Sequence, residues 1–515
     1  MPISQRTTIR MRFWIGLIVW HAAASGVCWG SETGLWQRFE AQFINKSWQG
    51  NPFDLELAVR FTSPSGRTID HLGFYAGGGH WKVYFMPDEL GEWTFRTRSP
   101  DGDLDQQSGS FVCVDSVLEP PLRAAGRYWK LGPDKGDFPV IWNPPVPDGA
   151  HWGFRARDLY DPTVQEALRF ADEEVGARLL GFSALLIASV DWAQSWPQEA
   201  LPFVVGKEGT EFFLPFWDQL NAKLDAARAR DMGAYIMLYS DDAMTPDHFG
   251  LTPYSTAEIR FMRYVVARLA AYPHILWDSG IDIGEYRSRE WIDWYADWFL
   301  EHDPWRHPVG SRSGGGSGGG MPQNGTYFST GGASLPSRSE LMAFYSGSEV
   351  PVVHTDHWRP FIGRGHWTHR KIRTATWRCG LTGAQALYID YNQGKVQYDA
   401  VVREAGAIGV ASEFFRRVLR SDPTRLESSD RLIVAGDNAI LAAHPNREYL
   451  IYDRDGGSLR IDLSSVQGVF RADWHNPRTG DKISSGEPRG GMIHTFVSPT
   501  QDQDWVLHIV NRDQY

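Results

Sequence analysis

Apolar and polar positions alternate in short segments over residues 35–114, and turn residues separate the segments. Residues 53–59 alternate with a period of two, as a strand with one buried face does. Residues 80–85 and 92–97 predict two further strands, and residues 64–66 (Pro-Ser-Gly) predict a turn. This spacing predicts an antiparallel β-sandwich.

From about residue 138 to residue 412, candidate strands alternate with candidate helices, the order that favours a parallel sheet. An amphipathic helix is predicted over residues 216–230, and further helices over 256–271 and 289–301. The candidate strands occupy residues 138–142, 177–182, 234–239, 275–277, 308–310, 326–328, 350–353 and 386–389. Their number and the helices between them predict an α/β region, a (β/α)8 TIM barrel.

After residue 428 the pattern is again strand and turn, with strands predicted at residues 439–444, 448–452 and 505–510. These predict a second, smaller β-sandwich. The expected domains are an N-terminal β-sandwich (31–118), the barrel (119–425) and a C-terminal β-sandwich (426–515).

The first thirty residues have the order of a secretory signal peptide. Arg6, Arg10 and Arg12 precede an apolar run at residues 13–20, and small residues follow at 22–26. The run is too short to span a membrane. The sequence therefore predicts a secreted or periplasmic protein with no membrane span once residues 1–30 are removed.

Charge and cysteine content narrow the class of protein. Removal of the three leader arginines takes the formal net charge from −11 to −14, and so acidic a protein is a poor nucleic-acid binder. Only Cys113 and Cys379 remain, which excludes a disulfide framework and leaves their pairing open. The 23 Trp, 19 Tyr and 27 Phe suit core packing, and an excess of Trp also suits stacking on sugar rings.

Several short sequence motifs resemble those of a group of bacterial glycoside hydrolases. Residues 51–53 (NPF), 61–66 (FTSPSG) and 91–93 (GEW) are similar to the sandwich that precedes the barrel in these enzymes. Residues 474–480 (WHNPRTG) and 504–507 (DWVL) resemble a collagen-binding-type sandwich that often closes such chains. Between them, the barrel looks like clan A glycoside hydrolases of the apiosidase-like kind.

This resemblance implies two catalytic carboxylates. The clan carries Asn-Glu after strand four and Glu after strand seven, and these positions hold Ile281-Asp282 and Asp356 here. We expect Asp282 to be the general acid and Asp356 the nucleophile or base, with Glu285 as a rival acid. Because Asp is one methylene shorter than Glu, the carboxyls could move from about 5–5.5 Å apart, as in retaining enzymes, toward the about 6.5–9.5 Å of inverting ones.

Polar and aromatic residues at the other strand ends are expected to contact the substrate, with packing at the barrel rim as the alternative. These residues are Trp142, Trp192, Tyr239, Asp241, Asp242, Arg312, Tyr327, His354, His357, Trp358, Arg359, Tyr388 and Asp390. His354 and His357 flank Asp356 and could tune its pKa.

The segment from His357 to Ile389 contains no Asp or Glu. It does contain a series of basic residues: Arg359, Arg364, Arg370, Lys371, Arg373 and Arg378. Since Arg pairs with planar anions, this segment predicts an anionic polysaccharide substrate carrying sulfate or uronate groups. The alternative is that these residues lie on the seventh helix and pair with acids elsewhere.

Taken together, the sequence predicts a secreted glycoside hydrolase that acts on a polysaccharide or oligosaccharide through two carboxylates. A noncatalytic carbohydrate-binding protein on the same scaffold and a polysaccharide lyase remain alternatives. No cofactor or metal is predicted, because residues 101–105 (DGDLD) lack the full pattern of a calcium loop.

Overall fold

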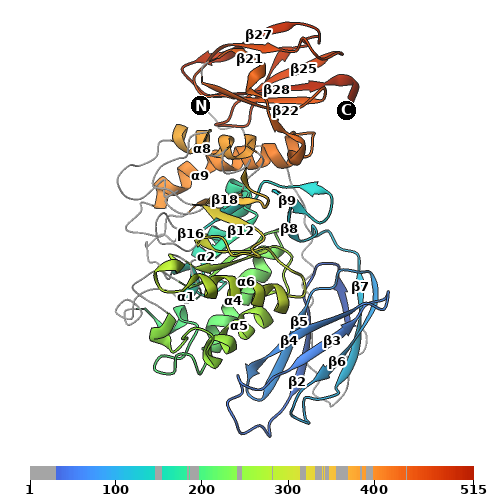
Figure 1. Ribbon diagram of the computed structural model, residues 1–515, viewed down its shortest axis with the longest axis vertical. Helices are drawn as coiled ribbons and strands as arrows, with labels where there is room; N and C mark the ends of the chain where they lie inside the picture. The colour runs from blue at the N-terminus through green and yellow to red at the C-terminus, as the bar shows by residue number, and fades with distance from the viewer. Residues whose placement is uncertain are drawn as a thin grey trace.

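The computed structural model of the chain (Figure 1) describes most of the sequence after the predicted leader. The described residues are 31–144, 153–182, 185, 196–239, 246–280, 282–313, 320–330, 339, 342, 347–354, 369–382, 386–389, 398–436 and 438–514. Among them, no helix is both long and apolar enough to span a membrane.

The N-terminal unit is a sandwich-like sheet with strand order β1-β7-β6-β3-β4-β5-β2. Its neighbours are antiparallel, apart from the parallel pair β1 and β7. Its core contains stacked aromatic rings, with Phe39 3.9 Å from Phe111 and Phe61 3.8 Å from Phe85 between centroids. The strands are β1 (Ser31–Gly34), β2 (Phe39–Ile44), β3 (Ala58–Thr62), β4 (Thr68–Gly77), β5 (His80–Phe85), β6 (Gly91–Arg98) and β7 (Ser108–Val114).

The strand predicted at residues 53–59 is wrong over most of its length, because β3 begins only at Ala58. Asn51 forms a local turn instead: its side-chain oxygen accepts a hydrogen bond from the Phe53 amide at 3.0 Å. The Phe53 ring then packs on Phe212 and Tyr264 of the central unit. The apolar character of Phe53 therefore reflects contact with another unit.

The central unit is built on one parallel sheet with strand order β15-β14-β13-β12-β11-β19-β18-β17-β16. Each strand predicted for this region overlaps a strand of the sheet. The edge strands β15 and β16 are separated in sequence only by Ser311, so the two ends of the sheet meet and it is nearly closed. The strands are β11 (Val140–Trp142), β12 (Leu179–Phe182), β13 (Gly233–Tyr239), β14 (Ile275–Gly280), β15 (Val309–Gly310), β16 (Arg312–Ser313), β17 (Phe328–Thr330), β18 (Val352–His354) and β19 (Ala386–Ile389).

Helices follow the strands of this sheet and cover it (Figure 1). The three predicted helices are confirmed, with ends shifted by about two residues. Ser255 and Ser288 cap α5 and α6, since their hydroxyls accept hydrogen bonds from Glu258 N at 3.1 Å and Trp291 N at 3.3 Å. The helices are α1 (Gly153–Ala156), α2 (Pro162–Phe170), α4 (Leu214–Arg228), α5 (Thr256–Leu269), α6 (Arg289–His302), α8 (His369–Leu381) and α9 (Tyr398–Glu413).

A short antiparallel sheet precedes the parallel one: β8 (Leu122–Ala125), β9 (Tyr128–Leu131) and β10 (Lys135–Gly136). The indole of Trp129 in β9 donates a hydrogen bond to Val352 O at 3.1 Å, which ties this sheet to the start of β18.

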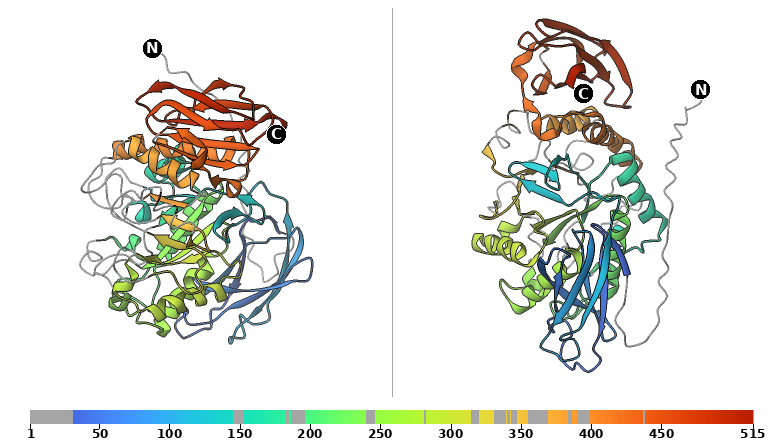
Figure 2. Two further views of the ribbon diagram at one scale, coloured as in Figure 1. Left: turned by 45° about the horizontal axis from the view of Figure 1, so that its top comes forward. Right: turned by 90° about the vertical axis from the view of Figure 1, so that its right-hand side faces the viewer.

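The C-terminal unit has two sheets, ordered β20-β22-β23-β28-β25-β26 and β21-β24-β27, and it packs on α8 (Figure 2). Most of its buried apolar residues form their own cluster, whereas those of the N-terminal and central units form one continuous core. Its strands are β20 (Glu427–Ser428), β21 (Ile433–Ala435), β22 (Ala439–His444), β23 (Glu448–Asp453), β24 (Gly456–Asp462), β25 (Phe470–His475), β26 (Lys482–Gly486), β27 (Ile493–Gln501) and β28 (Trp505–Asn511). Cys113 and Cys379 are both buried and free.

Candidate active site

The candidate site begins where β14 ends, and buried groups inside the sheet fix that end. The Asp278 carboxylate accepts hydrogen bonds from the hydroxyls of Tyr235 at 2.8 Å and Tyr327 at 3.0 Å. Its other oxygen accepts from Gly280 N at 2.9 Å. Asp278 is fully buried, and burial together with its negative charge raises the pKa of Tyr327 well above the usual value. These bonds fix the direction in which the chain leaves the sheet.

The chain then passes through two unusual backbone conformations. Gly280 has φ 142°, and a Cβ there would lie 2.4 Å from Tyr239 O, so only glycine fits. Asp282 has φ 48° and ψ 37°, in the left-handed region that Asp tolerates better than most residues. Strained residues cluster at functional sites, and this one carries the predicted acid.

Asp282 and Glu285 lie on one turn. Asp282 precedes the 3-10 helix η5 (Ile283–Glu285), and Glu285 N donates a hydrogen bond to Asp282 O at 2.9 Å. Asp282 is half-buried and Glu285 is exposed, while Ile283 between them is buried and anchors the turn. Solvent therefore reaches both candidate acids from a backbone that is held in place.

Arg287, two residues after this turn, fastens it to the helices behind. Its buried guanidinium donates hydrogen bonds to Asp247 at 2.9 Å, Leu251 O at 2.6 Å and Glu258 at 3.2 Å. Glu258 lies in the first turn of α5 and is fully buried. Burial raises the pKa of Glu258, and its hydrogen bonds with Trp291 and Arg287 oppose that shift.

Sequence reasoning did not identify Arg287 or Glu258. The one local signal was the Ser255-x-x-Glu258 spacing of a capping box, which indicates a helix start but no link to the candidate acids. Glu258 accepts a hydrogen bond from Tyr254 N at 2.7 Å and also binds partners on other elements.

Tyr239, a predicted substrate residue, belongs to the same buried network. Its hydroxyl donates to Glu258 at 3.1 Å, and its ring packs near Phe261 and Trp291 with centroids 6.1 and 5.8 Å away. The side chain is fully buried between β13 and helices α5 and α6. Tyr239 thus supports the loop that carries Asp282.

Three other predicted substrate residues are also buried. Trp142 packs against Phe170 of α2, and the Tyr327 ring lies beside Trp129, with centroids 5.7 and 5.8 Å apart respectively. His354 ends β18 and is 1% exposed. These three side chains are buried in the structure, and their contact with a substrate stays a prediction.

The remaining predicted site residues stay predictions. For Arg312 in β16 and Tyr388 in β19 the structure gives only the backbone. The others lie outside the described residues: Asp356, Trp192, Asp241, Asp242, His357, Trp358, Arg359 and Asp390. No group of three or more metal-binding side chains occurs within the described part of the chain.

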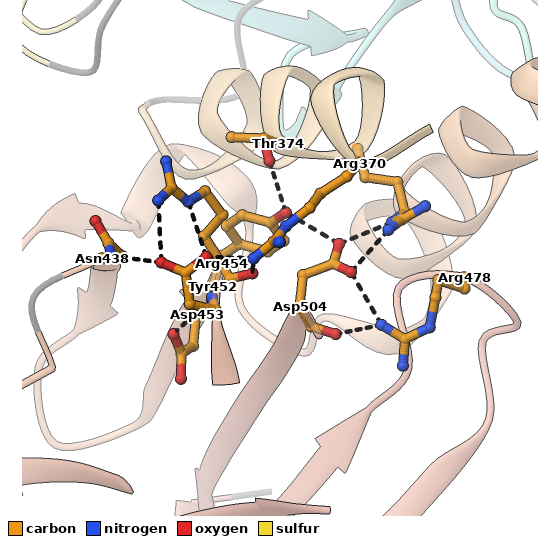
Figure 3. A network of polar contacts seen from close by, with 10 residues as sticks. Arg370, Thr374, Asn438, Tyr452, Asp453, Arg454, Arg478 and Asp504 are labelled. Atoms are coloured by element: carbon orange, nitrogen blue, oxygen red, sulfur yellow. Dashed lines mark hydrogen bonds and ion pairs between the residues drawn. The ribbon is translucent and has the colours of Figure 1, made fainter. Parts of the chain in front are cut away.

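Two arginines of the acid-free segment face the C-terminal sandwich (Figure 3). Arg373 on α8 binds both carboxylate oxygens of Asp504, at 2.7 and 2.8 Å, and Arg370 pairs with Asp455. The alternative interpretation, pairing with acids elsewhere, is therefore correct for these two residues. Both arginines lack acidic neighbours in the sequence because their partners, Asp455 and Asp504, lie 85 and 131 residues further along the chain.

Comparison with known proteins first defines the class of fold. Residues 32–100 match the family "Domain of unknown function (DUF5060)", and residues 430–510 match "Putative collagen-binding domain of a collagenase". The second match confirms the predicted type of the C-terminal sandwich. Solved glycoside hydrolases share the fold over 76–93% of this chain, although the apiosidase-like kind of barrel stays a prediction.

Three of these structures are particularly informative. A "putative glycoside hydrolase" from Bacteroides vulgatus aligns over 93% of this chain and 100% of its own, with a TM-score of 0.75 at 16% identity. A glycoside hydrolase family 5 structure from the same organism aligns over 76% and 94%, with a TM-score of 0.60 at 17% identity. A third, titled "Glycoside hydrolase", aligns over 77% and 98%, with a TM-score of 0.58 at 12% identity. No match was found among curated proteins.

Proposed function

We propose that the protein is a secreted bacterial glycoside hydrolase, which cleaves O-glycosidic bonds of a complex polysaccharide on a closed (β/α)8 barrel. The observation that carries the proposal is the turn at the end of β14, where a solvent-accessible Asp282 is held in a left-handed conformation. Barrel enzymes carry catalysis at the C-terminal ends of their strands. The fold similarity to glycoside hydrolases supports the same reading.

In the proposed mechanism two carboxyl groups share one glycosidic bond. Protonated Asp282 gives its proton to the bridging oxygen as the bond to the anomeric carbon breaks. Asp356 either attacks that carbon, and water then displaces it, or removes a proton from water that attacks directly. Arg287 and Glu258 hold the Asp282 turn, so that its short side chain meets the bond in one position.

The proposal includes an anionic substrate with sulfate or uronate groups. Arg370 and Arg373 pair with acids of the chain, so the support comes from Arg359 and Arg364, which follow β18 in the sequence. Turnover of charged glycans should exceed that of neutral ones and fall as salt rises from about 0.05 to 0.5 M, since salt screens exposed charges. Equal turnover of both kinds, with no salt effect, would remove this part of the proposal.

Product analysis tests the activity itself. The full chain is incubated with a panel of plant and algal polysaccharides, and reducing ends and ultraviolet absorbance are measured together. A hydrolase releases reducing ends without absorbance. A lyase product would absorb as an unsaturated uronate, and a binding protein would give no product; either result contradicts the proposal.

A further inference from the structure

A hollow of about 340 Å³ opens on the N-terminal sandwich, apart from the candidate active site. It lies between the loop after β2 and the hairpin that joins β4 to β5. Small-molecule sites usually have volumes of about 300–1,000 Å³, so one or two sugar rings fit this space. The residues that line it are Asn45, Lys46, Trp48, Gly50, Pro52, Tyr75, Gly78, Gly79 and Trp81.

Three of the nine lining residues are aromatic, and one of them is presented to solvent. Trp48 is 37% exposed, while Trp81 is 1% exposed and lies below, with its ring centroid 4.9 Å from that of Tyr75. An exposed indole face binds the C–H face of a pyranose. The exposed Trp48 ring can therefore stack on a sugar, whereas packing in a core does not explain a Trp at this position.

The Trp48 ring is held in position before any ligand arrives. The buried side chain of Asn45 accepts hydrogen bonds from Ser47 N and Trp48 N, both at 3.0 Å, and donates to Asp101 at 2.6 Å. A Cβ at Gly50 would lie 2.9 Å from the Trp48 ring, so glycine lets the chain pass close against the indole. A ring fixed in this way loses little conformational entropy on binding.

The lining also contains a buried polar group and an exposed charged one. The indole N–H of the buried Trp81 has no hydrogen-bond partner among the described residues. Buried donors are nearly always satisfied, and one left without a partner costs about 1–3 kcal/mol. The exposed Lys46 at the rim offers a donor to the hydroxyl groups of a sugar.

The hollow lies on the side of the molecule where the strands of the parallel sheet end. In βα units each helix begins on that side, and the loop contacts the beginnings of two helices. Asn51 donates a hydrogen bond to Thr210 O at 2.9 Å, shortly before α4, and Asp54 pairs with Arg260 in α5 at 2.6 Å. A Cβ on Gly77 of the hairpin would lie 2.9 Å from Leu214, the first residue of α4.

We propose that this hollow is a second glycan-binding site, in which a sugar ring of the polysaccharide stacks on Trp48 on the same side of the molecule as the candidate acids. This proposal gives the N-terminal sandwich a role in binding the polysaccharide. The choice of a glycan rests on the proposed function, but binding at this site requires no catalysis.

Affinity electrophoresis of the full chain tests the site, in native gels that contain pectin, arabinoxylan, laminarin or carrageenan. At least one polymer should retard the unmodified chain. Trp48→Ala should weaken that binding about tenfold, as loss of a central aromatic contact does, and Trp48→Tyr, which keeps a ring, should restore most of it. Leu90→Ala is the matched control, because Leu90 is 52% exposed on the same sandwich and lies at the opposite end of β5.

Three results would overturn the site: no retardation by any polymer, equal retardation of the unmodified chain and Trp48→Ala, or an equal loss in Leu90→Ala. Reducing ends measured on the same polymers separate this inference from the proposed function. If retardation depends on Trp48 but no product forms, the glycan-binding site is supported and the proposed hydrolase activity is contradicted. If product forms without retardation that depends on Trp48, the hydrolase activity is supported and the glycan-binding site is contradicted.

Discussion

Single residues decide the backbone at the candidate site. Gly280 and Asp282 both have positive φ values within three residues, directly after a strand whose end is fixed by Asp278. The sequence allowed Asp282 to be chosen as the acid, through its place after the fourth strand. It gave no sign of the constraint at Gly280, because that depends on the close passage of the Tyr239 carbonyl from a neighbouring strand.

Gly280→Ala should lower the free energy of unfolding by about 2–4 kcal/mol, because the new Cβ meets the Tyr239 carbonyl and φ is unfavourable. Urea unfolding measures the loss. Gly102→Ala is the control: a Cβ there has no atom within 4 Å, and the change should stay within about 0.5 kcal/mol. A similar small change at Gly280 would mean that the β14 turn is not constrained as described.

At the scale of elements, local sequence patterns correctly predicted those helices and strands that depend on interactions between neighbouring residues. The helix α5 was predicted over residues 256–271, and the structure begins it at the same residue, Thr256. The segment at residues 53–57 was mispredicted because Asn51 turns the chain there and Phe53 packs on the central unit, a contact far away in sequence. The sequence also left open whether the basic segment with Arg373 binds substrate anions or pairs with acids elsewhere, because Asp504, its partner, lies on a different unit.

The contact between α8 and the C-terminal sandwich depends on Asp504. This carboxylate, 1% exposed, binds Arg373, Tyr452 at 3.0 Å and Arg478 at 2.9 Å (Figure 3). Its charge partners lower the pKa of Asp504 against the opposing effect of burial. Since the sandwich has largely its own core, this cluster is a main tie between the two units.

Asp504→Asn should cost about 3–5 kcal/mol, because it leaves the buried Arg373 without its counter-charge. Calorimetry should then resolve a separate, earlier unfolding transition for the C-terminal sandwich. Asp462→Asn on the same sandwich is the control, since Asp462 is only half-buried and bonds locally to Ser464. If the two variants unfold alike, the cluster does not couple the units.

At the scale of the whole molecule, three buried histidines link stability to pH, one in each unit. His71 lies against Trp305 of the central unit, His274 accepts a hydrogen bond from Leu122 N, and His475 packs on Phe414. Burial lowers the pKa of His71 and of His475 to about 4, and that of His274 well below its usual value. The folded protein therefore keeps these rings neutral where the unfolded chain takes up protons.

Stability should fall as the pH drops from about 6.5 to about 4, because only the unfolded chain binds these protons in that window. Each histidine with a pKa near 4 contributes on the order of 3 kcal/mol to the loss at pH 4. Urea unfolding between pH 7 and 4 measures the slope, and His71→Leu should make it shallower. An unchanged slope in that variant would show that His71 does not remain neutral in the folded protein.

The most direct test of the account is the turnover of the natural polysaccharide by two variants of the β14 turn. Asp282→Asn keeps the left-handed backbone but removes the proton, so kcat should fall about 10²–10⁴-fold. Glu285→Gln, three residues away on the same turn, should retain activity within about threefold of the unmodified chain. Full activity in Asp282→Asn, or a loss confined to Glu285→Gln, would contradict the assignment of Asp282 as the acid.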